Sequence, residues 1–315
     1  MAVASITKRV DAITKITDDY KVVAPPCPRA VKIELTARCD FKCWFCATGQ
    51  KLRDARDMEF DLYAKLLDDL KQAGVEEIGL FYLGESFLYK QLPEAIKLAK
   101  DKGFPYVFLT TNGKLATADR VRACMEAGLD SLKFSFNFAN AEQFKDMTQV
   151  DAFDKVVKNI CDARKIRDEV EARTGHRCGL YASSILYDGE QRDRMQKAID
   201  LIVDAVDEHY FLPLYSQAGL TGGKRGTKPL AGNPGRVGAL RDPVPCWSLF
   251  TEARITFDGH LSACCFDHDG RFRMGDLKEM TFMDAWQSPN FQTLRQAHLN
   301  EDVTGTACEK CAAYN

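Results

Sequence analysis

The sequence lacks the features that would place a protein in a membrane or outside the cell. Among its 315 residues no apolar run reaches the roughly 18 residues that a membrane-spanning helix needs. The first residues contain no apolar stretch that could form the core of a signal peptide. We therefore expect a cytoplasmic protein with no membrane partner.

The sequence also lacks an excess of either charge. Its 43 Lys and Arg residues face 45 Asp and Glu residues, which gives a formal net charge of −2. Nucleic acids and anionic lipid surfaces bind strongly basic chains, so neither is expected as a partner. With 45% hydrophobic residues, a chain of this length can form one large α/β domain with a substantial core and a smaller appendage.

Short β-branched segments alternate with longer amphipathic segments between about residues 30 and 215. This alternation predicts parallel βαβ units of the α/β class that form a partial (β/α)6 TIM-like barrel, with ligands at the carboxyl ends of the strands. The segments predicted to be strands are 31–36, 77–82, 106–110, 131–136, 179–185 and 209–214. The predicted helices include 62–73, 93–102, 153–167 and 192–205.

The pattern changes twice after the barrel. A glycine-rich loop carries five basic side chains that either meet an anionic substrate or are simply solvated; they are Lys224, Arg225, Lys228, Arg236 and Arg241. A small cysteine-rich unit with one predicted hairpin at residues 253–264 follows. The expected parts are an N-terminal extension (1–29), the barrel (30–215), the loop (216–243) and a C-terminal cluster-binding domain (244–315).

Twelve cysteines are the most unusual feature of the composition. Without a signal peptide a disulfide framework is not expected, which leaves metal ligation, catalysis or burial. Cys39, Cys43 and Cys46 follow the first predicted strand with the spacing Cys-x3-Cys-x2-Cys. Three thiolates on one loop can hold one metal centre and leave its fourth position open, as a catalytic metal site requires.

A second set of cysteines lies in the C-terminal unit. Four thiolates, two of them in a Cys-x2-Cys knuckle, make a complete ligand set for a closed metal site. Metal binding there would stabilise the fold of a unit that has little hydrophobic core of its own. The set comprises Cys246, Cys264, Cys308 and Cys311. Spacing alone does not separate Cys264 from Cys265, and we favour Cys264 because of its place after the hairpin.

The first cysteine set, with the aromatic Phe45 directly before Cys46, resembles the radical S-adenosylmethionine (SAM) superfamily over roughly residues 30–215. The resemblance implies a [4Fe–4S] cluster on the three thiolates, with SAM bound to its open iron. Gly84 and Glu85 match part of the family's Gly-Gly-Glu-Pro segment, which contacts the SAM amino group, although one glycine and the proline are missing. Ser135 and Asn137 lie where polar side chains of the family hold the SAM ribose.

The C-terminal unit resembles the SPASM/twitch extension of radical SAM enzymes. The chain ends four residues after Cys311, which fits the shorter twitch form with one auxiliary [4Fe–4S] cluster. The implied cofactors are therefore SAM and two [4Fe–4S] clusters. The segments that carry this resemblance are 258–264, 274–277, 282–286 and 308–311.

The resemblance also implies a reaction. Such enzymes cleave SAM to a 5′-deoxyadenosyl radical that removes a hydrogen atom from the substrate, after reduction by an external donor such as flavodoxin or ferredoxin. In size and cysteine spacing the chain is similar to aminocyclitol and aminosugar dehydrogenases. We therefore expect a small-molecule substrate, either a polyol, an aminocyclitol or a sugar, that is oxidised with the auxiliary cluster as electron acceptor.

Three alternatives remain open. A sugar or aminoglycoside epimerase would need a thiol that returns a hydrogen atom, and Cys178, expected near the barrel mouth, is the candidate. A maturase of ribosomally made peptides usually carries a leader-recognition domain, whereas only about 30 residues precede the first strand, fewer than a small domain needs. A zinc-binding scaffold without activity would have no use for the open position at the first cysteine set.

Overall fold

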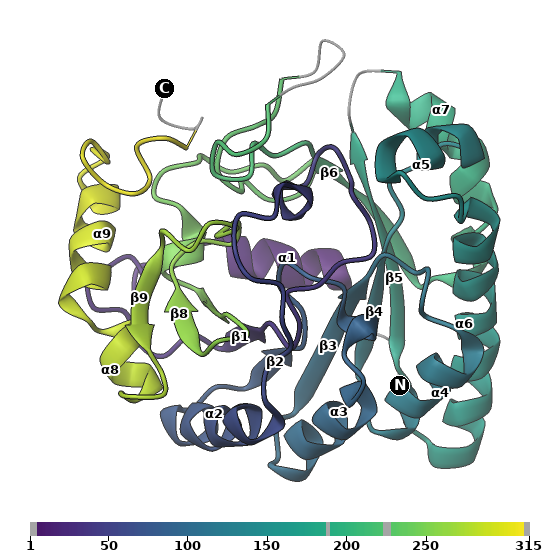
Figure 1. Cartoon of the computed structure of the whole chain (residues 1–315), viewed down its shortest axis with the longest axis horizontal. Helices are drawn as coiled ribbons and strands as arrows, with labels where there is room; N and C mark the ends of the chain where they lie inside the picture. Colours follow the sequence, from purple (N-terminus) through teal and green to yellow (C-terminus); the bar gives the residue numbers. More distant parts are fainter. Residues whose placement is uncertain (1–4, 187–189, 223–227, 312–315) are drawn as a thin grey trace.

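The computed structural model describes residues 5–186, 190–222 and 228–311. Lys224 and Arg225, two of the basic residues predicted in the loop, lie outside these ranges. Within the described residues, nine strands form one sheet in the order β6-β5-β4-β3-β2-β1-β7-β8-β9. Figure 1 shows this curved sheet with helices along its outer side.

The first six strands are parallel, which confirms the predicted α/β partial barrel. Their outward side chains, such as Val31 and Ile33, are fully buried beneath the surrounding helices. The strands are β1 (Ala30–Ile33), β2 (Glu77–Gly79), β3 (Tyr106–Thr111), β4 (Ser131–Ser135), β5 (Gly179–Leu186) and β6 (Glu208–Pro213).

The helices that connect these strands bury one apolar face against the sheet. In the first of them, Tyr63, Leu66, Leu67 and Leu70 are buried at helical spacing, and Gly74 ends the helix with a φ of 95° that favours glycine. No helix in the described ranges combines the length and apolar character needed to cross a bilayer. The helices are α2 (Phe60–Ala73), α3 (Leu92–Asp101), α4 (Ala118–Glu126), α5 (Ala141–Thr148), α6 (Phe153–Thr174) and α7 (Gln191–Asp200).

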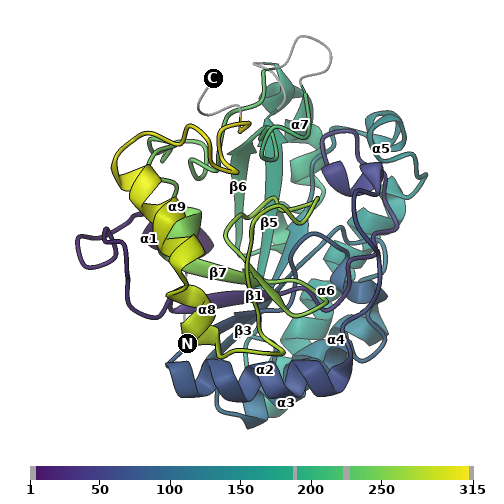
Figure 2. The ribbon, with the colours of Figure 1, turned by 60° about the vertical axis from the view of Figure 1, so that its left-hand side comes forward.

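The C-terminal unit extends the same sheet. β7 (Glu252–Ile255) pairs in parallel with β1, and β8 (His260–Ser262) and β9 (Arg273–Asp276) continue in antiparallel fashion. The β7–β8 pair confirms the predicted hairpin. Figure 2 shows β7 beside β1, with α8 (Phe282–Trp286) and α9 (Pro289–Leu299) at the same side of the molecule.

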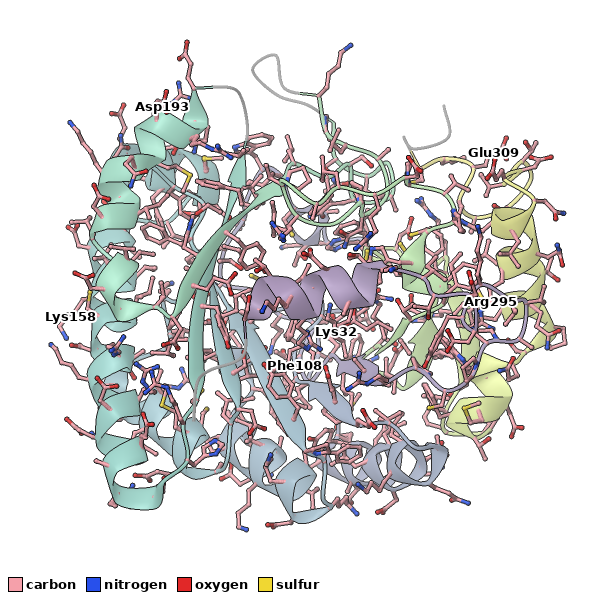
Figure 3. The ribbon with its side chains drawn as sticks, turned by 180° about the vertical axis from the view of Figure 1, so that it is seen from behind. Lys32, Phe108, Lys158, Asp193, Arg295 and Glu309 are labelled. Carbon is pink, nitrogen blue, oxygen red and sulfur yellow. The ribbon has the colours of Figure 1, made fainter. Side chains whose placement is uncertain are left out.

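The N-terminal helix α1 (Ile6–Thr14) covers the inner face of the sheet. Figure 3 shows it crossing the strands beside Lys32 and Phe108. The Arg9 guanidinium lies 4.0 Å from the centre of the Phe108 ring. Arg236 and Arg241 of the glycine-rich loop bind Asp11 of α1 through its carboxylate and its carbonyl oxygen. These two basic side chains therefore hold α1 in place.

Candidate functional site

The loop with the first cysteine set leaves β1 and rests on the end of α5. The backbone N–H groups of Lys42 and Trp44 donate to the carbonyl oxygens of Thr148 and Met147, at 3.0 and 3.1 Å. A further bond of 3.0 Å runs from the N–H of Cys46 to the carbonyl of Cys43 and tightens the loop. These bonds fix the curve on which the predicted ligands lie.

The three thiols of this loop lie close enough to influence one another. Burial raises the pKa of Cys39 to about 12, and the Cys46 thiol adds to the increase. Burial also raises the pKa of Cys43, and both Cys46 and Cys39 act in the same direction. Buried thiols ionise readily when a bound metal takes their sulfur atoms as ligands, so this arrangement fits an iron–sulfur centre.

Gly84 lies where the segment after β2 passes against the segment that leads to Cys39. A side chain at Gly84 would overlap the carbonyl oxygen of Thr36 and come within 2.8 Å of that of Arg38. The next residue, Glu85, donates its N–H to the carbonyl of Arg38 at 2.8 Å. The close approach of the two segments explains why a glycine is needed here.

The Glu85 carboxylate is buried and fully engaged with the protein. It accepts hydrogen bonds from the Thr111 hydroxyl and the Asn112 N–H at 2.7 Å, and from the Phe87 N–H at 3.1 Å. Burial raises the pKa of Glu85 to about 7, although these bonds act against the increase. In this arrangement Glu85 shapes the turn after β3, and its role toward SAM stays a prediction.

Asp40 connects this turn to the cluster loop and was missed by the sequence analysis. Its carboxylate accepts a hydrogen bond of 2.8 Å from the Asn112 amide and pairs with the Lys114 ammonium at 3.1 Å. The position of Asp40 directly after Cys39 was the signal in the sequence that could have identified it.

The other predicted SAM contacts lie at the same end of the sheet. Ser135 ends β4 in register with Ser183 of β5, and no described residue binds its hydroxyl. The Asn137 side chain accepts a hydrogen bond of 3.1 Å from the Ile185 N–H. Phe45 is buried edge-on against Trp44. Ser135 therefore offers a free hydroxyl, and the contacts of all three residues with SAM remain predictions.

The second cysteine set lines one pocket, with a cavity volume of about 30 Å³. Cys246, Cys264, Cys265, Cys308 and Cys311 all contribute to its wall. In the knuckle, the Cys311 N–H donates to the Cys308 carbonyl at 2.9 Å. The pocket brings together every cysteine predicted for this site, and the choice between Cys264 and Cys265 stays open.

The geometry of these cysteines fits a cluster better than a single ion. In the described part of the chain, no group of three or more His, Cys, Asp or Glu side chains converges as one metal ion would require. Zinc draws four ligands to a single point, at about 2.3 Å for each sulfur. In a [4Fe–4S] cluster each thiolate binds a different iron, so thiols spread around a pocket suit it.

The first residues of the glycine-rich loop lie between the two cysteine sets. Gln217 accepts a hydrogen bond of 2.8 Å from the N–H of Ala47, directly after Cys46. Gly219 passes so close to the knuckle that a side chain there would overlap the carbonyl oxygen of Lys310. Residues 217–219 all have positive φ values, of 51°, 59° and 81°, which marks a strained segment. No sequence pattern indicated this connection.

A cavity of about 550 Å³ opens beside Cys39. Arg53, Thr48 and the buried His268 contribute to its wall. The His268 Nδ1 lies 3.3 Å from the Thr48 hydroxyl, which accepts a hydrogen bond of 3.4 Å from the Cys46 thiol. Since His268 follows Cys264 by four residues, the C-terminal unit reaches the first cluster loop, and the cavity gives a ligand space beside Cys39.

Cys178 lies at the other end of the sheet. It directly precedes β5 and is 1% exposed, and its pKa is raised by burial and by nearby Asp130 and Cys124. The carboxyl ends of the strands, where Ser135 lies, are opposite. The expectation that Cys178 lies near the barrel mouth was wrong, because the residue before a strand lies at its amino end.

Comparison with protein families yields two matches. The radical SAM superfamily matches residues 33–202, more than half of the chain. The SPASM family, an iron–sulfur cluster-binding domain, matches residues 246–312. Together the two domains imply SAM and two [4Fe–4S] clusters, which the two cysteine sets fit.

Curated relatives match over less than half of their length. A GTP 3′,8-cyclase of Chlorobaculum tepidum is 32% identical over 129 residues, which are 41% of this chain and 38% of that protein. A probable GTP 3′,8-cyclase of Metallosphaera sedula is 30% identical over 135 residues, or 42% of each protein.

Solved structures of similar fold cover most of the chain. BtrN in complex with AdoMet (SAM) and 2-DOIA has a TM-score of 0.58 at 16% identity, over 90% of this chain and 92% of BtrN. Streptococcus suis SuiB bound to the precursor peptide SuiA has a TM-score of 0.69 at 13% identity, over 92% of this chain and 71% of SuiB. These likenesses concern the fold.

Proposed function

The chain belongs to the radical SAM superfamily, and from this membership we propose that it is a dehydrogenase that oxidises a secondary alcohol of a small polyol, aminocyclitol or sugar. The observation that carries the proposal is the second cysteine pocket, whose wall contains five cysteines, enough for one ligand to every iron of a cluster. Full ligation leaves no iron for substrate, which suits a group that only transfers electrons.

Two groups of residues would hold the cofactors. Cys39, Cys43 and Cys46 would bind the first cluster, and the pocket around Cys246 and Cys308 would bind the second. When bound, SAM and the first cluster supply the radical that removes a hydrogen atom, and the second cluster supplies an electron acceptor.

The protein's own residues position these groups and keep water away. The hydrogen bond from the Ala47 N–H to Gln217 and the packing of Gly219 on the knuckle place this segment between the two cysteine sets. Exclusion of water protects a reactive intermediate from side reactions. Oxidation of an alcohol carbon removes one hydrogen atom, one electron and one proton. A base at the barrel mouth would take the proton, and a donor such as flavodoxin or ferredoxin would reduce the first cluster in the cytoplasm.

The curated relatives support a second candidate, a reaction on GTP or a similar purine nucleotide. The likeness to SuiB keeps a peptide substrate among the alternatives. An epimerase, the redox-neutral alternative, needs a thiol near the substrate, and the burial of Cys178 at the amino end of β5 argues against that residue.

The test is anaerobic turnover of the reconstituted protein with SAM, a reductant and separate panels of cyclitols, sugars and GTP. We expect 5′-deoxyadenosine together with a cyclitol or sugar product lighter by two hydrogen atoms. The variant with Cys39, Cys43 and Cys46 changed to Ala is the control and should form neither. A product of unchanged mass in H₂O that gains one deuterium in D₂O would instead identify an epimerase. Turnover of GTP alone would favour the second candidate.

A further inference from the structure

Three charged side chains form a group between β1 and β7, in which the Lys32 side chain is 19% exposed and the other two are buried. The Glu252 carboxylate pairs with the Lys32 ammonium and with the Arg254 guanidinium, each at 2.8 Å. The side chains of Glu252 and Arg254 are 1% and 0% exposed. Two cations share one carboxylate, so the group carries a net positive charge where charge is costly to bury.

The Arg254 side chain lies against the segment that begins at Cys246. Its Nη1 donates to the carbonyl oxygens of Ser248 and Glu252 at 2.9 and 2.7 Å. Its guanidinium carbon lies 4.9 Å from the ring centre of Trp247, the residue after Cys246. These contacts fix the cation beside the second cysteine pocket, which Cys246 and Ser248 line.

One donor of Arg254 has no partner. Its Nε is buried and makes no hydrogen bond to any atom of the described residues. Buried donors in folded proteins are almost always paired. An acceptor that belongs to a group bound in the neighbouring pocket would account for this exception.

We propose that Arg254, fixed by Glu252, is a positioning residue that raises the reduction potential of the auxiliary cluster. Reduction adds negative charge to a group that four thiolates already make negative. A fixed cation in surroundings of low dielectric constant stabilises that added charge. The inference rests on the proposed function, because an electron acceptor needs a potential high enough to take an electron from the substrate.

The experiment is a redox titration of the full chain with Cys39, Cys43 and Cys46 changed to Ala. This variant lacks the first cluster, so only the auxiliary cluster contributes to the signal. Arg254→Met should lower the equilibrium constant for its reduction at least tenfold, equal to 59 mV for one electron. Arg254→Lys keeps the charge and should retain most of the potential.

The chain offers a matched control in Arg295 of α9, labelled in Figure 3. It is another fully buried arginine of the C-terminal unit, packed 4.2 Å from the Trp286 ring centre and bound to the Leu249 carbonyl. Because Leu249 also lines the pocket, Arg295→Met should shift the potential by a smaller amount than Arg254→Met does.

A second variant keeps the proposal testable if Arg254→Met fails to assemble its cluster. Lys32→Met also removes one positive charge and leaves the hydrogen bonds of Arg254 in place, so it should shift the potential in the same direction. An unchanged potential in whichever of these variants holds the cluster would overturn the proposal. If the parent protein has no C-terminal cluster, the proposed function fails instead.

Discussion

At the scale of single residues, the inner face of the barrel contains a cation without a counter-ion. Lys133 lies on β4 two residues before Ser135, on the same side of the strand, in register with Thr110 and Tyr181. Burial lowers its pKa to about 8 from the usual 10.5, and the charge of Arg9 acts in the same direction. The charge of Glu252 acts in the opposite direction, but no ion pair joins Lys133 to a carboxylate of the described residues. The buried charge of Lys133 therefore destabilises the folded protein when no ligand is bound.

Lys133→Met should therefore stabilise the protein near pH 7, by about 1–3 kcal/mol. Below pH 8 the ammonium is charged in both the folded and the unfolded state, and the cost of burying it is fully present. Between pH 8 and 10.5 the folded state releases its proton first, so the cost falls as the pH rises.

Anaerobic melting curves at pH 7 and pH 9.5 check this prediction. The increase in melting temperature should be large at the lower pH and small at the higher one. Lys158→Met is the control, since Lys158 is exposed on α6 and pairs with Asp162 at the surface (Figure 3). A Lys133 variant that melts earlier than the parent at pH 7 would show that a partner stabilises the ammonium.

A second prediction for a single residue concerns Gly84. Gly84→Ala should displace the segment after β2, because its new methyl group overlaps the carbonyl oxygen of Thr36. Overpacking of this kind costs about 1–3 kcal/mol, which the fold survives while the SAM site is distorted. We expect at least a tenfold loss of 5′-deoxyadenosine formation, with iron content retained. Activity at the parental level would mean that the segment has room to move.

At the scale of elements, residues 216–222 are the connection between the two cysteine sets. Gln217 binds the first cluster loop, and Gly219 packs against the knuckle. The segment is short and strained, so it fixes the distance between the two sites more firmly than a flexible loop would.

Gly219→Ala should selectively impair the second site. Gly219 has a φ of 81°, and a side chain there meets Lys310 within the knuckle. We expect iron per chain to fall by about half, because one [4Fe–4S] cluster of two is lost. Gly222→Ala is the matched control, since no atom lies within 4 Å of the position of its added carbon. Full iron content in the Gly219 variant would contradict the role assigned to this segment.

The sequence predicted the elements that depend on local patterns. Six parallel strands follow from β-branched runs, and the spacing of Cys39, Cys43 and Cys46 points to one centre because all three lie on one loop. It did not predict features that depend on distant contacts. The pairing of β1 with β7 joins residues more than 200 positions apart, and Gln217 meets Ala47 across 170 positions.

At the scale of the whole molecule, one sheet carries both cysteine sets. β7 pairs with β1, so the C-terminal unit shares a hydrogen-bonded sheet with the barrel. The contact of His268 with Thr48 adds a second link at the cluster loop. The two cysteine sets are therefore linked through one hydrogen-bonded sheet and through this contact at the cluster loop.

The two cysteine sets should together hold two [4Fe–4S] clusters. The most direct test is iron and acid-labile sulfide per chain after anaerobic reconstitution, for the parent protein and for the variant with Cys39, Cys43 and Cys46 changed to Ala. We expect about eight irons in the parent and about four in the variant. About four irons that fall to none would contradict this expectation, because the C-terminal set would then hold no cluster and the proposed electron acceptor would be missing.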